Sequence, residues 1–226
     1  MKTGDTNTQD LRCWVEVDTA ALRHNVRQIR GLVSNGCILA PTVKANAYGH
    51  GLVIASRAFL AGGADWLCVD SLDEALALRR ERIEVPLYIM GYVPPGRVAE
   101  AMEADVEMVV YDESTLQAVR EEHRKSGRVA RLHVKVETGN QRQGLDPPAA
   151  LTLADRVAST SGAVLRGVCS HFANVEDTTD HSFARHQLRT FDDAVSAMRA
   201  RGLDVPLAHI SNSAAVILWS EASRDL

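Results

Sequence analysis

Short apolar runs that alternate with amphipathic helical stretches constrain the fold of this chain more than any other feature. Continuous apolar runs of this length are typical of strands that are buried on both faces of a sheet. Seven runs are predicted strands, at Cys37–Val43, Trp66–Val69, Pro86–Met90, Val106–Val110, Arg131–Val136, Val164–Ser170 and Pro206–Ile210. Helical patterns lie between them, for example at Leu72–Arg80, Glu113–Lys125, Pro148–Ser159 and Ser182–Arg201. Repeated strand–helix units with short Gly, Pro and Asp turns predict a parallel sheet.

The spacing of these units favours a (β/α)8 TIM barrel over a doubly wound sheet. No G-x-G-x-x-G follows the first strand, because Gly49, Gly51 and the pair Gly62–Gly63 do not fit that pattern. A closed barrel needs eight strands, and the chain reaches Leu226 directly after the helix that follows the seventh. We therefore predict an incomplete α/β barrel with about seven of eight strands. Its open edges would lie where the eighth strand belongs.

The segment before the first predicted barrel strand carries a strand pattern and a helix pattern. Cys13–Val17 alternates like a short strand. Asp18 or Thr19 then caps an amphipathic helix, and Asn35–Gly36 closes it.

Composition and charge exclude several classes of protein. The net charge of −4 and the pI near 6.1 argue against nucleic acid or an anionic membrane as the main partner. The four cysteines include no C-x-x-C pair, which favours reduced thiols over a disulfide framework or a zinc site. Residues 1–11 form a polar tail without the apolar core of a signal peptide. We expect a cytoplasmic protein whose single domain spans residues 12–226.

The segment Val43–Gly51, with the sequence VKANAYGHG, is the most specific chemical signal in the chain. It follows a predicted strand, so Lys44 is expected at the carboxyl end of that strand, where α/β barrels place their chemistry. The segment closely resembles the lysine motif of the alanine racemase family, which binds pyridoxal 5′-phosphate (PLP). The resemblance implies that Lys44 binds PLP as a Schiff base and that the hydroxyl of Tyr48 contacts the phosphate.

A second motif covers Lys135–Gly144 and resembles the family's Lys-x-Asp-Thr-Gly-x-x-Arg-x-Gly. The resemblance implies that Arg142 contacts the cofactor's phenolic oxygen and the substrate carboxylate. Lys135 corresponds to a lysine that holds this arginine and is carbamylated in some relatives. Glu137 stands where Asp is common and Gln143 where Leu is common, so the substrate preference stays open.

Two further motifs follow the sixth and seventh predicted strands. The Ser-His-Phe-Ala sequence after the sixth resembles a family motif whose histidine, here His171, lies against the pyridine ring. After the seventh, the match to His-x-x-Asn-Ser-Ala implies that Asn212 and Ser213 bind the cofactor, Ser213 with neighbouring amides at its phosphate. His209 resembles a histidine behind the cofactor site. From the residues alone, Ser211 or Ser213 is a simple helix cap.

Taken together, the resemblance runs from about Trp14 to Leu226 and implies a PLP-dependent racemase, with alanine as the default substrate. Lys44 would move the α-proton on one face of the substrate, and racemisation needs a second acid–base on the other face. In the family, a tyrosine from a C-terminal β-domain of the partner subunit fills that role. We expect this chain to be the N-terminal barrel without that β-domain, a poor racemase alone and a homodimer at full length.

Three other functions stay open. A single-domain PLP carrier without catalysis is one. A metal-dependent barrel hydrolase is another, because His133, His171 and His209 together with Lys135 superficially match its ligands, although the first strand lacks His-x-His. A catalytically silent interaction protein is the third.

Overall fold

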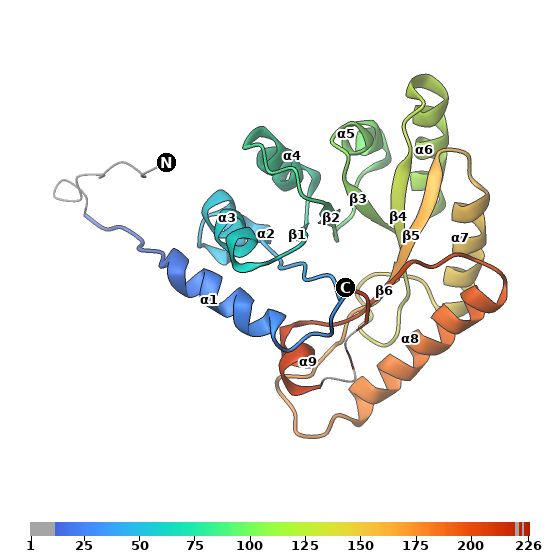
Figure 1. The fold of residues 1–226 in the computed structure, drawn as a ribbon. Coiled ribbons are helices and arrows are strands. Elements are labelled where there is room, and N and C mark those ends of the chain that lie inside the picture. Colours follow the sequence, from blue (N-terminus) through green and yellow to red (C-terminus); the bar gives the residue numbers. More distant parts are fainter. Residues whose placement is uncertain (1–11, 220–221, 223) are drawn as a thin grey trace.

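A single curled sheet of six parallel strands, covered by helices on its outer side, forms the scaffold of the molecule (Figure 1). The computed structural model describes residues 12–219, 222 and 224–226, and the predicted polar tail at residues 1–11 lies outside them. The strands follow one another in sequence order across the sheet, as successive strand–helix units of a barrel do. They are β1 (Leu67–Val69), β2 (Leu87–Ile89), β3 (Glu107–Val110), β4 (Ala130–Lys135), β5 (Ala163–Cys169) and β6 (Leu207–His209).

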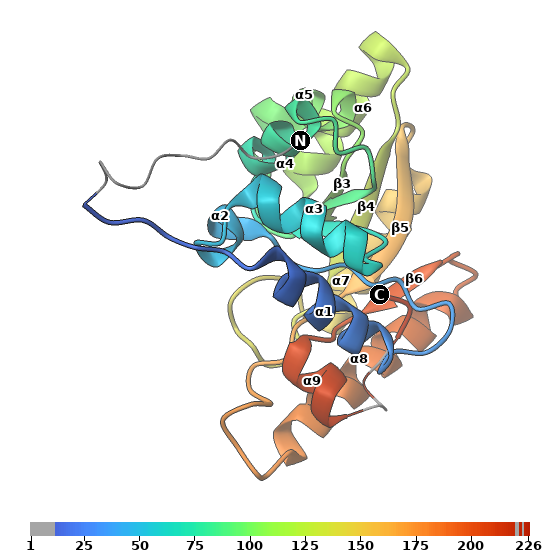
Figure 2. The same cartoon turned by 60° about the vertical axis from the view of Figure 1, so that its left-hand side comes forward.

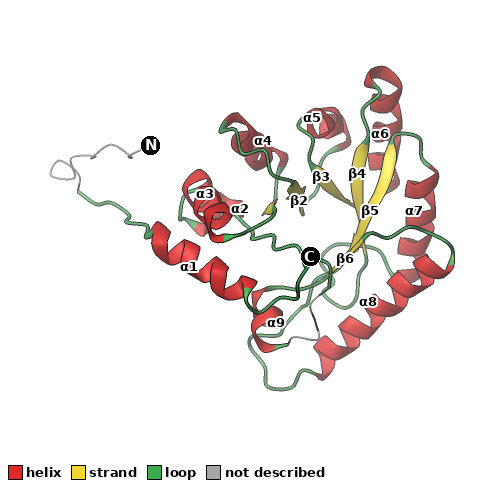
Figure 3. Cartoon of the chain, viewed as in Figure 1, coloured by secondary structure: helices red, strands yellow, loops and turns green. Residues whose placement is uncertain are grey.

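The helices pack against the sheet through apolar side chains, and Figure 3 shows the resulting alternation of strand and helix. Their bounds are α1 Thr19–Arg30, α2 Lys44–Tyr48, α3 Leu52–Gly62, α4 Leu72–Arg80, α5 Val98–Glu103, α6 Glu113–Ser126, α7 Pro147–Ser159, α8 Ser182–Ala200 and α9 Ser213–Leu218. A 3₁₀ turn at Pro95–Arg97 precedes α5. In the described part of the chain, no helix combines the length and the apolar character needed to cross a membrane.

The first predicted strand, at residues 37–43, is an extended segment with a single bridge to the sheet. Thr42 pairs with Cys68 of β1, and the N–H of Val43 donates to the carbonyl of Cys68 at 2.8 Å. Pro41 has no N–H to donate, which limits the regular ladder at this point. The segment still occupies the place of the first barrel strand beside β1.

The prediction of a strand at Cys13–Val17 is wrong. These residues have no regular secondary structure, and the side chain of Val15 is 80% exposed. A strand needs a neighbour for its backbone groups, and this segment extends away from the sheet (Figure 2). The helix that follows begins as predicted, because the side chain of Asp18 accepts from the N–H groups of Ala20 and Ala21. It ends at Arg30, before the predicted Asn35–Gly36.

The two open edges of the sheet are bridged by one residue near the C-terminus. The backbone N–H of Asp225 donates to the carbonyl of Ala208 in β6 at 3.0 Å. Its carbonyl accepts from the N–H of Ile38 at 2.8 Å, and its carboxylate accepts from the N–H of Ala208 at 2.8 Å. Asp225 therefore lies in the position of the eighth strand and links β6 to the segment 37–43.

Candidate functional site

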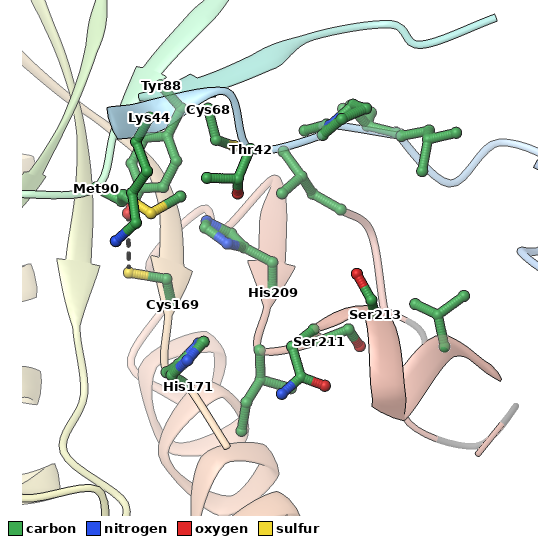
Figure 4. Close-up of a pocket in the computed structure, with 18 of the residues that line it drawn as sticks. Thr42, Lys44, Cys68, Tyr88, Met90, Cys169, His171, His209, Ser211 and Ser213 are labelled. Carbon is green, nitrogen blue, oxygen red and sulfur yellow. Dashed lines mark hydrogen bonds between the residues drawn. The ribbon is translucent and has the colours of Figure 1, made fainter. Parts of the chain in front are cut away.

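A cavity of about 1060 Å³ opens at the carboxyl ends of the strands. Its lining includes residues that directly follow β1, β2, β3, β5 and β6. Side chains from several of these elements gather around one space in Figure 4. All eight residues that the sequence motifs indicate line this cavity: Lys44, Tyr48, Lys135, Arg142, His171, His209, Asn212 and Ser213.

The backbone after Lys44 forms a turn of left-handed helix. Ala45, Asn46, Ala47 and Tyr48 have φ values of 51°, 56°, 53° and 54°. The left-handed conformation costs roughly 1–2 kcal/mol for each residue with a side chain, so contacts with the surroundings must offset the strain. The side chain of Asn46 provides one of them, accepting from the N–H of Leu52 at 2.8 Å.

The amine of Lys44 lies in the cavity beside a carboxylate. Its Nζ donates to Oδ1 of Asp70 at 3.3 Å, and Asp70 directly follows β1. Tyr48, at the end of the left-handed turn, also borders the cavity but is 63% exposed. The turn therefore delivers an amine to the cavity wall and a phenol to its rim.

The loop that carries Arg142 is shaped by Glu137. A bridge between Val136 and Leu145 closes the loop, and the carboxylate of Glu137 accepts from the N–H of Gly139. Burial alone would raise the pKa of Glu137, but backbone N–H groups from Gly139 to Arg142 hold it below its usual value. Glu137, one of the two departures from the family motif, thus organises the turn that presents Arg142 to the cavity.

Cations surround His171 on its side of the cavity. Burial lowers the pKa of His171 to about 4, and the positive charges of Lys135, Arg142 and Lys44 add to this effect. Burial also lowers the pKa of Lys135, whose Nζ donates to the carbonyl of Ser170 at 2.9 Å. His171 is therefore a neutral ring at neutral pH, in a place that favours an anionic ligand.

A buried hydrogen-bonded chain runs from β3 through β4 to His209 at the cavity. Nε2 of His133 lies 2.7 Å from Oε2 of Glu107, and Nδ1 of His133 lies 2.8 Å from Nε2 of His209. A carboxylate can only accept, so Nε2 of His133 donates to it and Nδ1 accepts from His209. Burial lowers the pKa of both histidines, despite the opposing effect of Glu107 on His133.

The short helix α9 closes the cavity beside β6. Asn212 is its N-cap, with Oδ1 accepting from the N–H of Ala215 at 2.9 Å, so a cap at Ser211 or Ser213 is wrong. The hydroxyl of Ser211 instead donates to the carbonyl of Ala222 at 2.6 Å. Ser213, the first residue of α9, is left exposed at the side of the cavity (Figure 4).

Several residues that line the cavity were not among the predicted site residues. Asp70 faces Lys44, and the hydroxyl of Tyr88 lies 3.3 Å from Sγ of Cys169. Asp70 could have been found, because it follows a predicted strand at the end where barrels place their active sites. The contact between Tyr88 and Cys169 joins residues 81 positions apart and leaves no local pattern.

The histidines do not form a metal site. Both ring nitrogens of His133 are used in hydrogen bonds to Glu107 and His209. Among the described residues, no group of three or more His, Cys, Asp or Glu side chains is arranged to hold a metal ion. The geometry therefore gives the metal-dependent hydrolase no support.

Comparisons with known proteins agree with the motifs. Alanine racemases of Desulfovibrio desulfuricans and Symbiobacterium thermophilum are each 36% identical to this chain, over 96% and 94% of its length. The structure of alanine racemase from Streptomyces lavendulae matches with a TM-score of 0.87 at 35% identity, covering 93% of this chain. The Bacillus anthracis alanine racemase with bound L-Ala-P matches with a TM-score of 0.88 at 30% identity, covering 94%.

The chain spans 58% and 56% of the length of the two sequence relatives and 55% of each structural relative. The sequence model of the family described as "Alanine racemase, N-terminal domain" matches residues 17–226. The chain therefore belongs to the alanine racemase family, through its N-terminal domain.

Proposed function

We propose that this chain is the PLP-binding barrel of an amino acid racemase that interconverts L-alanine and D-alanine. The observation that carries the proposal is the convergence of all eight motif residues, from separate segments of the chain, on one cavity with the amine of Lys44 in its wall. Residues 12–226 would form one barrel domain, and a C-terminal β-domain would correspond to the length of the relatives that this chain does not cover.

The donor set fits PLP. A primary amine at Lys44 can bind its carbonyl carbon, and the hydroxyls of Tyr48 and Ser213 are suited to its phosphate. Asn212, whose side chain caps α9, would contribute by holding that phosphate-binding turn in place. The neutral ring of His171 would offer a flat face for the pyridine, and His209, which is hydrogen-bonded to His133, would lie behind the cofactor.

Residues on the β4 side of the cavity would bind the amino acid. When bound, PLP supplies an electron sink that makes the α-proton of an amino acid acidic. The guanidinium of Arg142 would orient the substrate carboxylate. Lys135 lies close enough to Arg142 for that positive charge to help lower its pKa, and it would hold the arginine in a carbamylated form, as the family resemblance implies. Lys44 would then take or return the α-proton on one face.

The second acid–base would come from outside the described residues, as the family resemblance implies. Tyr88 is buried with its hydroxyl on Cys169, which makes it unsuited to the opposite face. A homodimer of the full-length protein would supply the missing group. The four free cysteines, two of them buried, support a cytoplasmic location.

Spectroscopy of the purified chain with PLP tests the cofactor assignment. We expect an absorption band from PLP bound as an imine, and borohydride should reduce this imine and attach the cofactor permanently. Mass spectrometry should then place the attached cofactor on the peptide that contains Lys44. Lys44→Ala should abolish this attachment, whereas Lys125→Ala, an exposed lysine on α6, should retain it. A folded wild-type chain with no fixed cofactor, or one with the cofactor on another lysine, would contradict the proposal.

Exchange of the α-proton distinguishes a site with one working acid–base, Lys44, from a PLP carrier without catalysis. A single base on one face exchanges the α-hydrogen without inverting the carbon. In D₂O with PLP, we expect deuterium to enter one alanine enantiomer faster than racemisation occurs. No exchange by the loaded chain would favour the carrier, and rapid complete racemisation would place both acid–bases within this chain.

A further inference from the structure

The strained turn behind Lys44 is bonded to a carboxylate from another element. Glu74 lies in the first turn of α4, and its Oε1 accepts from the N–H of Ala45 at 2.6 Å. Ala45 is the first left-handed residue and directly follows Lys44. The bond therefore holds the peptide that sets the direction of the Lys44 side chain.

The other oxygen of the same carboxylate holds the loop that carries the counter-ion of Lys44. Oε2 of Glu74 accepts from the N–H of Asp70 at 2.9 Å and from the N–H of Ser71 at 3.2 Å. Asp70 in turn accepts from Nζ of Lys44 at 3.3 Å. Glu74 thus bonds to the backbone N–H of Asp70 and to that of Ala45, the residue that directly follows Lys44.

The Asp70 loop is also confined from the side of β2. A Cβ added at Gly91 would lie 2.3 Å from the carbonyl oxygen of Asp70 and 3.1 Å from its Cγ. Because only glycine leaves room there, the loop packs tightly between β2 and α4. Glu74 is then the group that joins this confined loop to the left-handed turn.

We propose that Glu74 is a positioning residue for Lys44. Its two oxygens fix the left-handed turn against the Asp70 loop, so that the amine occupies one place in the cavity. The inference rests on the proposed function, in which Lys44 is the reactive amine. It predicts that Glu74 controls the reactivity of Lys44 without touching cofactor or substrate.

A purely structural role makes a different prediction, and Ser71 provides the control. The hydroxyl of Ser71 accepts from the N–H of Glu74 at 3.3 Å, completing a capping box at the start of α4. Ser71→Ala weakens the helix cap but leaves the carboxylate bonds to Ala45 and Asp70 in place. If Glu74 serves only as a cap, both variants should affect Lys44 equally.

The first readout needs no cofactor. Wild type, Glu74→Ala, Glu74→Gln and Ser71→Ala are treated briefly with an amine-methylating reagent, and the modification rate of Lys44 is measured by peptide mass spectrometry relative to Lys125. For Glu74→Ala we expect a change of at least threefold in this ratio, as the Asp70 contact loosens. Ser71→Ala should stay within the wild-type range.

The second readout is the rate at which PLP forms its imine with the protein, followed by the absorption band that borohydride reduction removes. It should fall at least tenfold in Glu74→Ala and remain near wild type in Ser71→Ala. Glu74→Gln should rescue part of both readouts, because its amide oxygen keeps one acceptor for the Ala45 N–H. Should Glu74→Ala fail to fold, Glu74→Gln carries the same comparison with Ser71→Ala.

Equal effects of the Ser71 and Glu74 variants, or a folded Glu74→Ala with wild-type values in both readouts, would overturn the inference. Failure of the proposed function looks different: the wild-type chain would then bind no PLP, while the methylation ratio would still report on Glu74.

Discussion

Single buried residues carry much of the electrostatic organisation of this molecule, and Glu107 is the clearest case. It is 3% exposed, accepts from His133 and faces Arg131 and Arg166 at 3.2 and 3.5 Å. Glu107→Gln keeps an acceptor but removes the negative charge that faces both guanidinium groups, and only Arg131 has a further carboxylate partner among the ion pairs described, Asp105 at 2.8 Å. We expect a loss of about 2–4 kcal/mol in the free energy of unfolding, measured in urea.

The control for this prediction is Glu103→Gln, which alters a surface pair. Glu103 is exposed and lies 3.7 Å from Arg128. Pairs of this kind contribute about 0–1 kcal/mol. A similar loss of unfolding free energy in both variants would show that the buried hydrogen-bonded chain from Glu107 to His209 stabilises the fold no more than a surface pair does.

His171 predicts how stability depends on pH. Its pKa falls from the ordinary 6.5 to about 4 in the folded state, so between these values the unfolded chain binds more protons. The stabilising contribution is complete above pH 6.5 and is lost as the pH falls toward 4. We expect the melting temperature of wild type to fall more between pH 7 and 5 than that of His171→Gln.

Other groups also titrate in this range, so the comparison needs a second histidine variant. His24→Gln changes an exposed position on α1 and should follow the wild-type pH dependence. Identical slopes for the wild type and His171→Gln would contradict the prediction.

At the scale of residues, motifs found the cavity but not the groups that organise it. Lys44, Arg142 and His171 were predictable because each follows a strand within a specific local sequence. Glu74 was not, because its role depends on helix α4 meeting the turn after Lys44 in space. Glu107 was hidden for the same reason: its partners lie on neighbouring strands.

Secondary structure elements were predicted closely wherever the hydrophobic pattern was strong. The helix at Leu72–Arg80 has the predicted bounds, and the strands β1 to β6 differ from the predicted runs by at most one residue at either end. The two predicted strands that do not form regular strands lack either a neighbouring strand or a backbone N–H donor. Cys13–Val17 alternates in sequence but has no neighbouring strand, and Pro41 interrupts hydrogen bonding in the segment 37–43.

Close packing between two helices depends on small residues that the hydrophobic pattern of the sequence does not reveal. The packing of α1 against α3 is an example. A Cβ at Gly62 would lie 2.9 Å from Cβ of Val26 and 3.0 Å from the carbonyl oxygen of Arg23. Alanine has a higher helix propensity than glycine by about 1 kcal/mol, but forcing the two helices apart costs about 1–3 kcal/mol. We expect Gly62→Ala to lower the midpoint of urea unfolding.

Gly96→Ala is the matched control, because no atom lies within 4 Å of a Cβ added there. It should leave the midpoint unchanged or raise it slightly. A stabilising effect of Gly62→Ala would show that α1 can move away from α3 without cost.

At the scale of the whole molecule, closure of the curled sheet depends on residues 224–226. The expectation of two open edges is only partly correct, since Asp225 bonds to Ala208 on one edge and Ile38 on the other. The side chain of Arg224 reinforces this arrangement by pairing with Asp192 of α8 at 2.8 Å. The sequence did not reveal this, because three residues are too few to show a strand pattern.

This closure predicts a coupling between the C-terminal segment and the segment that ends at Lys44. Asp225→Ala removes the acceptor for the buried N–H of Ala208, which costs about 1–3 kcal/mol. Because the same residue bonds to Ile38, we expect amide hydrogen exchange to speed up at both Ala208 and Ile38, on opposite edges of the sheet. Asp204→Ala, at an exposed position before β6, should change neither amide. Faster exchange at Ala208 alone would mean that the edges are held independently, and faster exchange at both would show that Asp225 closes the sheet.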